Sequence, residues 1–217
     1  MGRTLNSTHG YLLLSRRLGE KSAWTLWFSE RYGIFGSRVQ GAGRAAVLPQ
    51  FFQCCELQCA ETSNGVLVNQ WLAVSSHALG VQESLLGFYL LELSRVLLPQ
   101  QVAVVDVYSA LESSLHSLAQ KEGADAVRAF ELQVLLSIDA LPDPTWDANG
   151  NAIEAHHHYQ IAEGQWYPAQ PGVSGADIIA LTEANVSPQR LSKLCKLCID
   201  HALAGRTLKT RSVLAQW

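Results

Sequence analysis

The sequence has 217 residues, of which 48% are hydrophobic, and its formal net charge is −3 at pH 7. This length suits one large or two small domains, and the apolar content is enough to fill a core. No apolar run is long enough to span a bilayer, no secretory segment opens the chain, and the cysteine count of five is odd. We therefore expect a cytoplasmic protein with reduced thiols, which excludes a membrane protein or a disulfide framework.

Charge is distributed unevenly along the chain. Residues 1–75 carry seven Lys and Arg against four Asp and Glu, residues 76–187 carry three against fourteen, and residues 188–217 carry six against one. Basic ends around an acidic middle indicate an anionic partner, although ordinary variation of surface charge produces the same asymmetry.

Residues 10–72 have the pattern of short β-strands separated by turns. Asn64-Gly65 lies between two apolar runs and is a strong hairpin signal. Five strands at near-regular spacing predict a small barrel of the OB-fold type in residues 1–75. The expected strands are Tyr11–Ser15, Ala23–Ser29, Gly33–Gln40, Phe51–Ala60 and Val66–Leu72.

Residues 76–217 have a helical pattern, so the expected fold class is α+β. Leu85–Pro99 is apolar on nearly every face, which predicts the buried central helix of an all-α domain. An irregular insert at about 141–174 should hold a hairpin of His158–Ile161 with Gln165–Tyr167. The other expected helices are Val102–Gln120, Ala124–Ala140, Gly175–Glu183 and Pro188–Ala204, followed by a closing segment at Thr210–Trp217.

Motifs for catalysis are weak, so we expect no enzyme and no cofactor. Gly41–Ala46 matches GxGxxA, but Pro49 falls where the helix of a dinucleotide site should run, which favours a turn. No nucleophile elbow, Walker loop or HExxH occurs. A thiol enzyme that uses Cys195 or Cys198 is a remote alternative.

Two groups have spacings typical of metal ligands, and for both we expect no metal. Cys195 and Cys198 form a CxxC followed by His201, but both thiols lie on the apolar stripe of a helix and no second CxxC exists. His156-His157-His158 has no nearby cysteine to complete a site, so an exposed polar loop is the favoured interpretation.

Cationic residues interleaved with tryptophans in the β region favour binding of single-stranded DNA, because phosphates pair with the charge and bases stack on the rings. The alternative is that the aromatic rings simply form the barrel core. The candidate DNA-binding residues are Arg16, Arg17, Lys21, Arg38 and Arg44, with Arg206, Lys209 and Arg211 in the tail.

A second candidate site lies in the third predicted helix. Arg128, Leu132 and Leu136 recur at helical spacing, so the arginine could pair with a carboxylate while the leucines hold a side chain of a partner peptide. A core stripe with Arg128 at its rim is the plainer alternative.

Four stretches together resemble the RecO family of bacterial recombination mediators. Gly87–Leu93 reads GFYLLEL, Arg128–Leu132 reads RAFEL and Ala204–Ser212 reads AGRTLKTRS, close to the family's G-[FL]-Y-x-N-E-L, R-R-F-E-L and G-G-[KR]-P-L-K-S-R-E. The chain from Leu14 to Ala42 also follows the family's first strands and its K-G-A-R turn.

The resemblance implies a non-enzymatic, nucleoid-associated protein of bacterial DNA repair and recombination. Such a protein binds and anneals single-stranded DNA and, with RecR, helps place RecA on strands coated by single-strand binding protein. The resemblance also implies that Arg128 holds the acidic, Phe-ended tail of that binding protein, with Leu132 and Leu136 lining the pocket.

Three departures from the family pattern bear on these roles. Gln40 replaces the Lys of the turn and the basic loop after it is missing, Ala129 replaces the second Arg of R-R-F-E-L, and the insert lacks zinc cysteines. The alternative function is therefore a protein–protein adaptor that binds that acidic tail, or RecR, with little DNA binding of its own.

Overall fold

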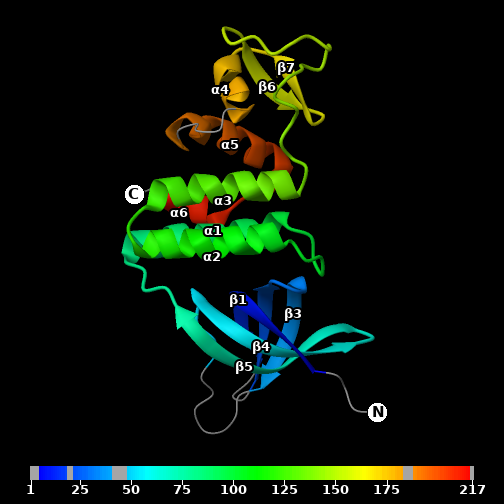
Figure 1. Cartoon of the computed structure of the whole chain (residues 1–217), viewed down its shortest axis with the longest axis vertical. Helices are drawn as coiled ribbons and strands as arrows, with labels where there is room; N and C mark the ends of the chain where they lie inside the picture. Colours follow the sequence, from blue (N-terminus) through cyan, green and yellow to red (C-terminus); the bar gives the residue numbers. More distant parts are fainter. Residues whose placement is uncertain (1–4, 19–21, 41–47, 183–187, 216–217) are drawn as a thin grey trace.

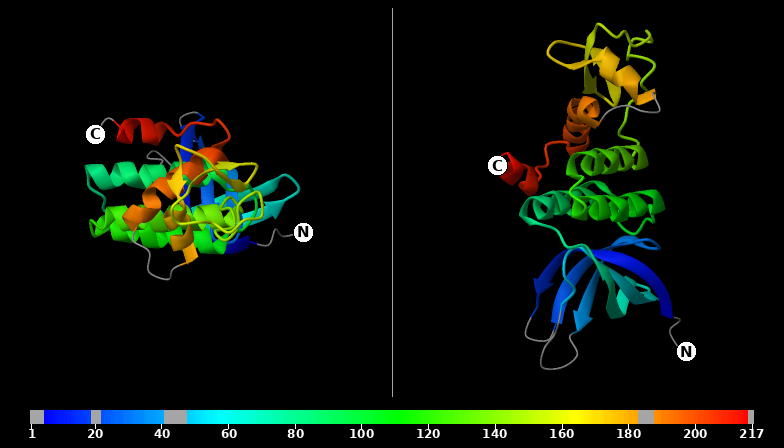
Figure 2. Two further views of the ribbon diagram at one scale, coloured as in Figure 1. Left: turned by 90° about the horizontal axis from the view of Figure 1, so that it is seen from above. Right: turned by 60° about the vertical axis from the view of Figure 1, so that its left-hand side comes forward.

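The computed structural model describes residues 5–18, 22–40, 48–182 and 188–215. The molecule is elongated: a curved sheet forms one end, helices are stacked in the middle, and a small insert forms the other end (Figure 1). Seen from two further directions, the helices cover one side of the sheet like a stack of layers (Figure 2). In the described part of the chain, no helix combines the length and the apolar character needed to cross a membrane.

The N-terminal half forms an antiparallel sheet of five strands in the order β3-β2-β1-β4-β5, which confirms the five predicted strands. The strands are β1 (Leu5–Arg17), β2 (Ser22–Ser29), β3 (Gly33–Gln40), β4 (Gln53–Thr62) and β5 (Gly65–Ser76). The predicted turn is present, since Thr62 pairs with Gly65 across Asn64.

The sheet is not closed into a barrel, contrary to the sequence-based expectation. Among the described residues, β3 and β5 share no backbone ladder, and the two edges are joined instead by a bond from the Val68 N–H to Ser37 Oγ, at 2.9 Å. Register shifts in β4–β5 between Cys54 and Cys55 bend the sheet without completing the ring of strand pairs.

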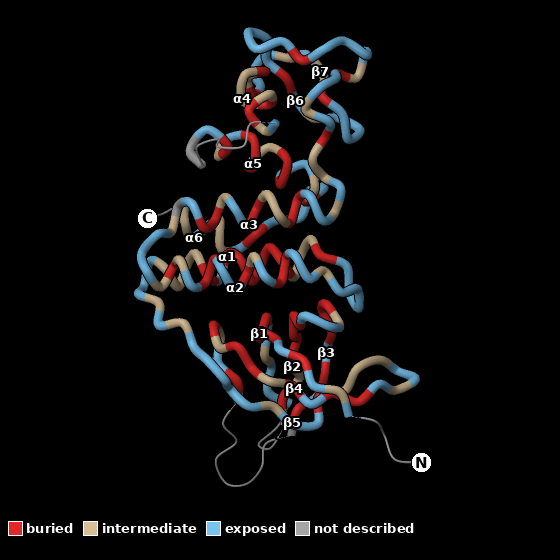
Figure 3. The backbone as a smooth tube through the Cα atoms, viewed as in Figure 1, coloured by how far each residue is buried: buried red, intermediate tan, exposed pale blue. Residues whose placement is uncertain are grey.

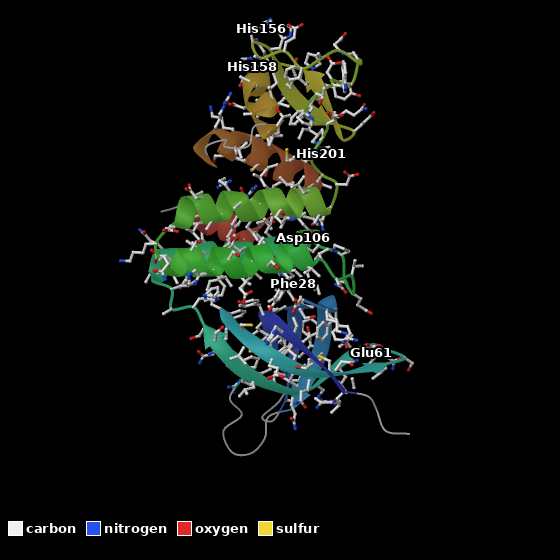
Figure 4. The ribbon with its side chains drawn as sticks, in the orientation of Figure 1. Phe28, Glu61, Asp106, His156, His158 and His201 are labelled. Carbon is white, nitrogen blue, oxygen red and sulfur yellow. The ribbon has the colours of Figure 1, made fainter. Side chains whose placement is uncertain are left out.

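Both faces of the sheet are covered by apolar side chains. Leu12, Trp27 and Leu57 belong to a cluster inside the curve of the sheet, while Phe28 belongs to a second cluster that continues into the helices. Figure 4 labels Phe28 where the sheet meets the helices, and the Tyr108 ring packs edge-on against it, with centroids 5.6 Å apart. The sheet and the helices therefore share one core, drawn as the buried stretches in Figure 3.

The central helix α1 (Val81–Leu97) is buried as predicted. Leu90, Leu91 and Leu93 are almost fully inaccessible, because other helices and the sheet contact α1 from several sides. The chain leaves the helical conformation at Leu98, directly before Pro99. The surrounding helices are α2 (Val105–Ala119), α3 (Gly123–Ser137), α5 (Pro188–Leu203) and α6 (Lys209–Leu214).

The insert contains the predicted hairpin, formed by β6 (His158–Ala162) and β7 (Gln165–Pro168), with β8 (Val173–Ser174) on the other side of β6. Glu163 and Gly164 both have positive φ, as a two-residue hairpin turn requires. The helix expected from Gly175 is shorter than predicted: α4 (Gly175–Ile179) gives way to a 3₁₀ turn at Ala180–Thr182.

Candidate functional site

A row of two arginines and one tryptophan crosses three neighbouring strands. Arg16 of β1 is directly opposite Trp24 of β2, and Trp24 is directly opposite Arg38 of β3. Side chains of directly opposed residues stand on the same face of a sheet, so the indole lies between two cations. Both arginines are exposed, and Trp24 is half-buried at the margin of the core.

The indole lies flat against β3 because position 36 is a glycine. A Cβ atom at Gly36 would be 2.8 Å from Cζ2 of Trp24, a distance that real side chains do not tolerate. The exposed Leu14 is on the same face, and its neighbour across β1–β2 is Leu26, which is opposite Gly36. The result is an apolar floor flanked by guanidinium groups, an arrangement that suits a base and its phosphates.

The other cations predicted in the β region have different positions. Arg17 is exposed at the end of β1, but its partner Ala23 is buried on the opposite face, so Arg17 points away from the row. Arg38 is partly engaged, since its Nη2 donates to Ser22 Oγ at 3.2 Å. Lys21 and Arg44 lie outside the described residues.

The basic tail does not share a surface with Arg16 and Arg38, because α6 lies among the helices (Figure 1). Arg206 donates from its three guanidinium nitrogens to the carbonyls of Leu203, Val96 and Ala202. Its charge therefore satisfies carbonyl groups at the C-terminal ends of α5 and α1.

Lys209 and Arg211, the other two tail cations, begin helix α6. The Lys209 backbone N–H donates to Glu92 at 3.1 Å, and the lysine side chain is exposed. Arg211 pairs with Asp200 and donates to the hydroxyl of Tyr89 at 3.3 Å. The tail cations that sequence analysis assigned to DNA thus have structural partners at Arg206 and Arg211.

Arg128 lines a cavity of about 450 Å³ enclosed by four helices. α3 supplies Arg128 and Glu131, α1 supplies Tyr89, α6 supplies Arg211, and α5 supplies Asp200. Three of the stretches that resemble the RecO family therefore meet at one place, a convergence that the sequence alone does not show.

A buried carboxylate organises this cavity. Glu131 is 1% exposed, pairs with Arg128, and accepts a hydrogen bond from the Tyr89 hydroxyl at 2.5 Å. Burial raises the pKa of Glu131, and the neighbouring Arg128 only partly offsets this effect. Burial also raises the pKa of the Tyr89 hydroxyl, so the phenol remains a donor.

The cavity carries a small excess of positive charge. Arg128, Lys196 and Arg211 oppose the carboxylates of Glu131 and Asp200 among the lining residues. Because the guanidinium groups are already paired, the exposed ammonium of Lys196 is the cation most open to an incoming anion.

An apolar groove of about 420 Å³ adjoins this cavity, and the two share Leu86 and Leu214. The groove lies between α1 and α6 and includes the exposed side chains of Val81, Phe88 and Val213. Sequence analysis missed it because its walls are more than 110 residues apart in the chain. The exposed valines at 81 and 213 were the only signal in the sequence.

The predicted leucines of α3 are outside both hollows. Leu132 is half-buried and Leu136 is 58% exposed, and neither lines the cavity beside Arg128. Their role in binding a peptide stays a prediction.

The cysteines are all buried, as expected for packing residues. Burial raises the pKa of Cys195 and of Cys198 to about 12, so neither thiol is a ready nucleophile or metal ligand. In the described ranges, the one group with metal-ligand spacing is Glu154 with His156 and His157, which precede β6 rather than form part of a strand.

Comparison of the chain with protein-family models and with curated proteins finds no match.

Proposed function

We propose that this chain is a RecO-type recombination mediator. It binds and anneals single-stranded DNA without covalent chemistry and, with RecR, helps to place RecA on strands coated by single-strand binding protein. The observation that carries the proposal is the row formed by Arg16, Trp24 and Arg38. Its guanidinium groups are spaced to contact phosphates while a base stacks on the indole.

The proposal includes an OB-fold for the N-terminal half. The sheet has the five antiparallel strands of that fold, and the bond between Ser37 and Val68 brings its outer strands β3 and β5 together. A partly open five-stranded barrel is typical of OB-folds, which hold oligonucleotides against one face of the strands.

The convergence of the family-like stretches supports the assignment to the family. Tyr89, Glu131 and Arg211 come from three separate motifs and form one hydrogen-bonded chain. A second link joins the first and last motifs, since Glu92 accepts bonds from Lys209 and Thr210. Motifs that hold one another in place are expected to occur together.

Annealing in this proposal follows from electrostatics. Two strands repel through their phosphates, and a protein that neutralises some of that charge allows complementary bases to meet. Because no bond forms or breaks, the residues required are cations and stacking surfaces.

The test is fluorescence anisotropy of a labelled single-stranded oligonucleotide over a salt series. We expect affinity to fall steeply with salt for the wild type, and the slope to fall by about two when Arg16 and Arg17 are both changed to Glu. Lys121→Glu, an exposed lysine in the α2–α3 connection, makes the same kind of charge change on another part of the molecule and should leave the slope nearly intact. Absence of binding at low salt would remove the mediator proposal.

The second candidate function is an adaptor that binds the acidic tail of single-strand binding protein, or RecR, with little affinity for DNA. The adjoining hollows favour it, because a Phe-ended acidic peptide has an aromatic ring for the groove and carboxylates for the cationic cavity. Titration with such a peptide should show binding that is weakened by Lys196→Glu and by Val213→Asp. Peptide binding without DNA binding would favour the adaptor over the mediator.

A further inference from the structure

The loop before β6 gathers three ligand-type side chains at one point. The Nε2 of His156 is 3.2 Å from Oε2 of Glu154, and the Nδ1 of His157 is 3.5 Å from the same oxygen. All three donor atoms lie within 4.8 Å of one another, and the two imidazole rings have centroids 4.3 Å apart. The side chains are exposed, at the end of the molecule opposite the five-stranded sheet (Figure 4).

The spacing of the donor atoms matches the coordination shell of a small divalent metal ion. Zinc binds imidazole nitrogen and carboxylate oxygen at about 2.0–2.1 Å, so adjacent ligands of a tetrahedral ion are about 3.3–3.4 Å apart. The two distances to Glu154 Oε2 fall on either side of this value. Imidazole with carboxylate also selects zinc and its neighbours over calcium or magnesium.

The backbone holds this loop in place. The Glu154 N–H donates to the Tyr159 hydroxyl at 3.0 Å, and the His157 N–H donates to the Glu154 carbonyl at 3.1 Å. The Gly175 N–H in turn donates to the His157 carbonyl at 2.8 Å. Only glycine fits at 175, because a Cβ there would be 2.0 Å from the Glu154 carbonyl oxygen. A fixed loop loses less entropy when it binds an ion.

We propose that Glu154, His156 and His157 form a binding site for Zn²⁺ or a similar divalent transition metal. Three protein ligands leave a coordination position open for water or for a donor atom from another molecule. Sequence analysis expected no metal at the histidines because it sought cysteines, and the third ligand is a glutamate two residues upstream.

The test is isothermal titration calorimetry of the full chain with ZnCl₂. We expect one ion per chain in the wild type. His156→Ala, His157→Ala and Glu154→Gln should each weaken binding by about tenfold or more, since even loss of a group behind a metal ligand costs about 10–100-fold. His158→Ala is the matched control, because that exposed histidine is next in the chain but outside the cluster.

Substitution with Co²⁺ gives a second readout, because its visible absorption reports a low-symmetry site with nitrogen ligands. The three ligand residues are exposed, so the variants should keep the wild-type circular dichroism spectrum. Failure of the wild type to bind ZnCl₂ overturns the proposal. Binding that survives all three ligand changes, or that is lost equally in His158→Ala, overturns it as well.

Discussion

The carboxylate of Glu92 accepts both the backbone N–H and the hydroxyl of Thr210, a residue 118 positions further along the chain. The backbone N–H of Lys209 donates to the same carboxylate, so Glu92 satisfies donors at the start of α6. This contact explains why a charged residue interrupts the apolar run of the central helix.

We expect Glu92→Gln to lower the free energy of unfolding by about 1–3 kcal/mol, because a neutral amide replaces an acceptor of three hydrogen bonds. Chemical denaturation at neutral pH measures the change. Glu122→Gln is the control, since that side chain is exposed and makes no capping bond. Equal stability of the two variants would contradict the role given to Glu92.

The same residue predicts a pH dependence of stability. Burial alone would raise the pKa of Glu92, but hydrogen bonds from Thr210 and Lys209 and the nearby Arg95 outweigh it, so the pKa is lowered. A lowered pKa stabilises the folded state above the ordinary carboxyl range and is lost as pH falls through the folded-state value. The difference in stability between wild type and Glu92→Gln should therefore shrink in acid. A difference that grows as pH falls would refute this.

Trp24 gives a prediction that separates stacking from charge. Trp24→Ala should weaken binding of single-stranded DNA by about 1–3 kcal/mol while leaving the salt slope nearly unchanged, because it removes a ring and no cation. Trp146→Ala is the control, since that ring is 54% exposed in the insert. Anisotropy titrations at several salt concentrations measure both quantities, and equal losses in the two variants would count against the row on β1–β3.

Arg206 should behave as a structural residue. Arg206→Met removes donors to three carbonyl groups, so we expect a lower midpoint of thermal unfolding and an unchanged salt slope for DNA binding. A reduced salt slope with unchanged stability would return Arg206 to the DNA-binding set that the sequence suggested.

The thiols should react slowly in the folded protein. Burial raises the pKa of Cys55 and Cys198 to about 12 and that of Cys59 to about 11, so few thiolates exist at neutral pH. A thiol-reactive dye should label all five cysteines rapidly only after denaturation. One cysteine labelled at the rate of a free thiol in the native state would revive the thiol-enzyme alternative.

Local features of the fold were readable from the sequence. The strand boundaries, the turn at Asn64-Gly65 and the hairpin at Glu163-Gly164 depend on short-range patterns, and the structure confirms them. Barrel closure was not predictable, because it depends on whether the edges of β3 and β5 meet.

The candidate sites show the same division. The alternation of residues in the strands placed Arg16 and Arg38 among the candidates, but only the register shows that both flank Trp24. Arg211 looked like a free cation because its partners Tyr89 and Asp200 come from other helices. Hydrophobic periodicity contains no information on contacts between such distant segments.

The contact between Tyr108 and Phe28 makes the boundary near residue 76 a boundary of the chain and not of the core. Residues 1–75 on their own would expose Tyr11, Leu13 and Phe28 to water, which favours aggregation over independent folding. A fragment cut at this boundary would thus be a poor substitute for the whole protein, and any force that a bound strand exerts on the sheet is borne directly by α1 and α2.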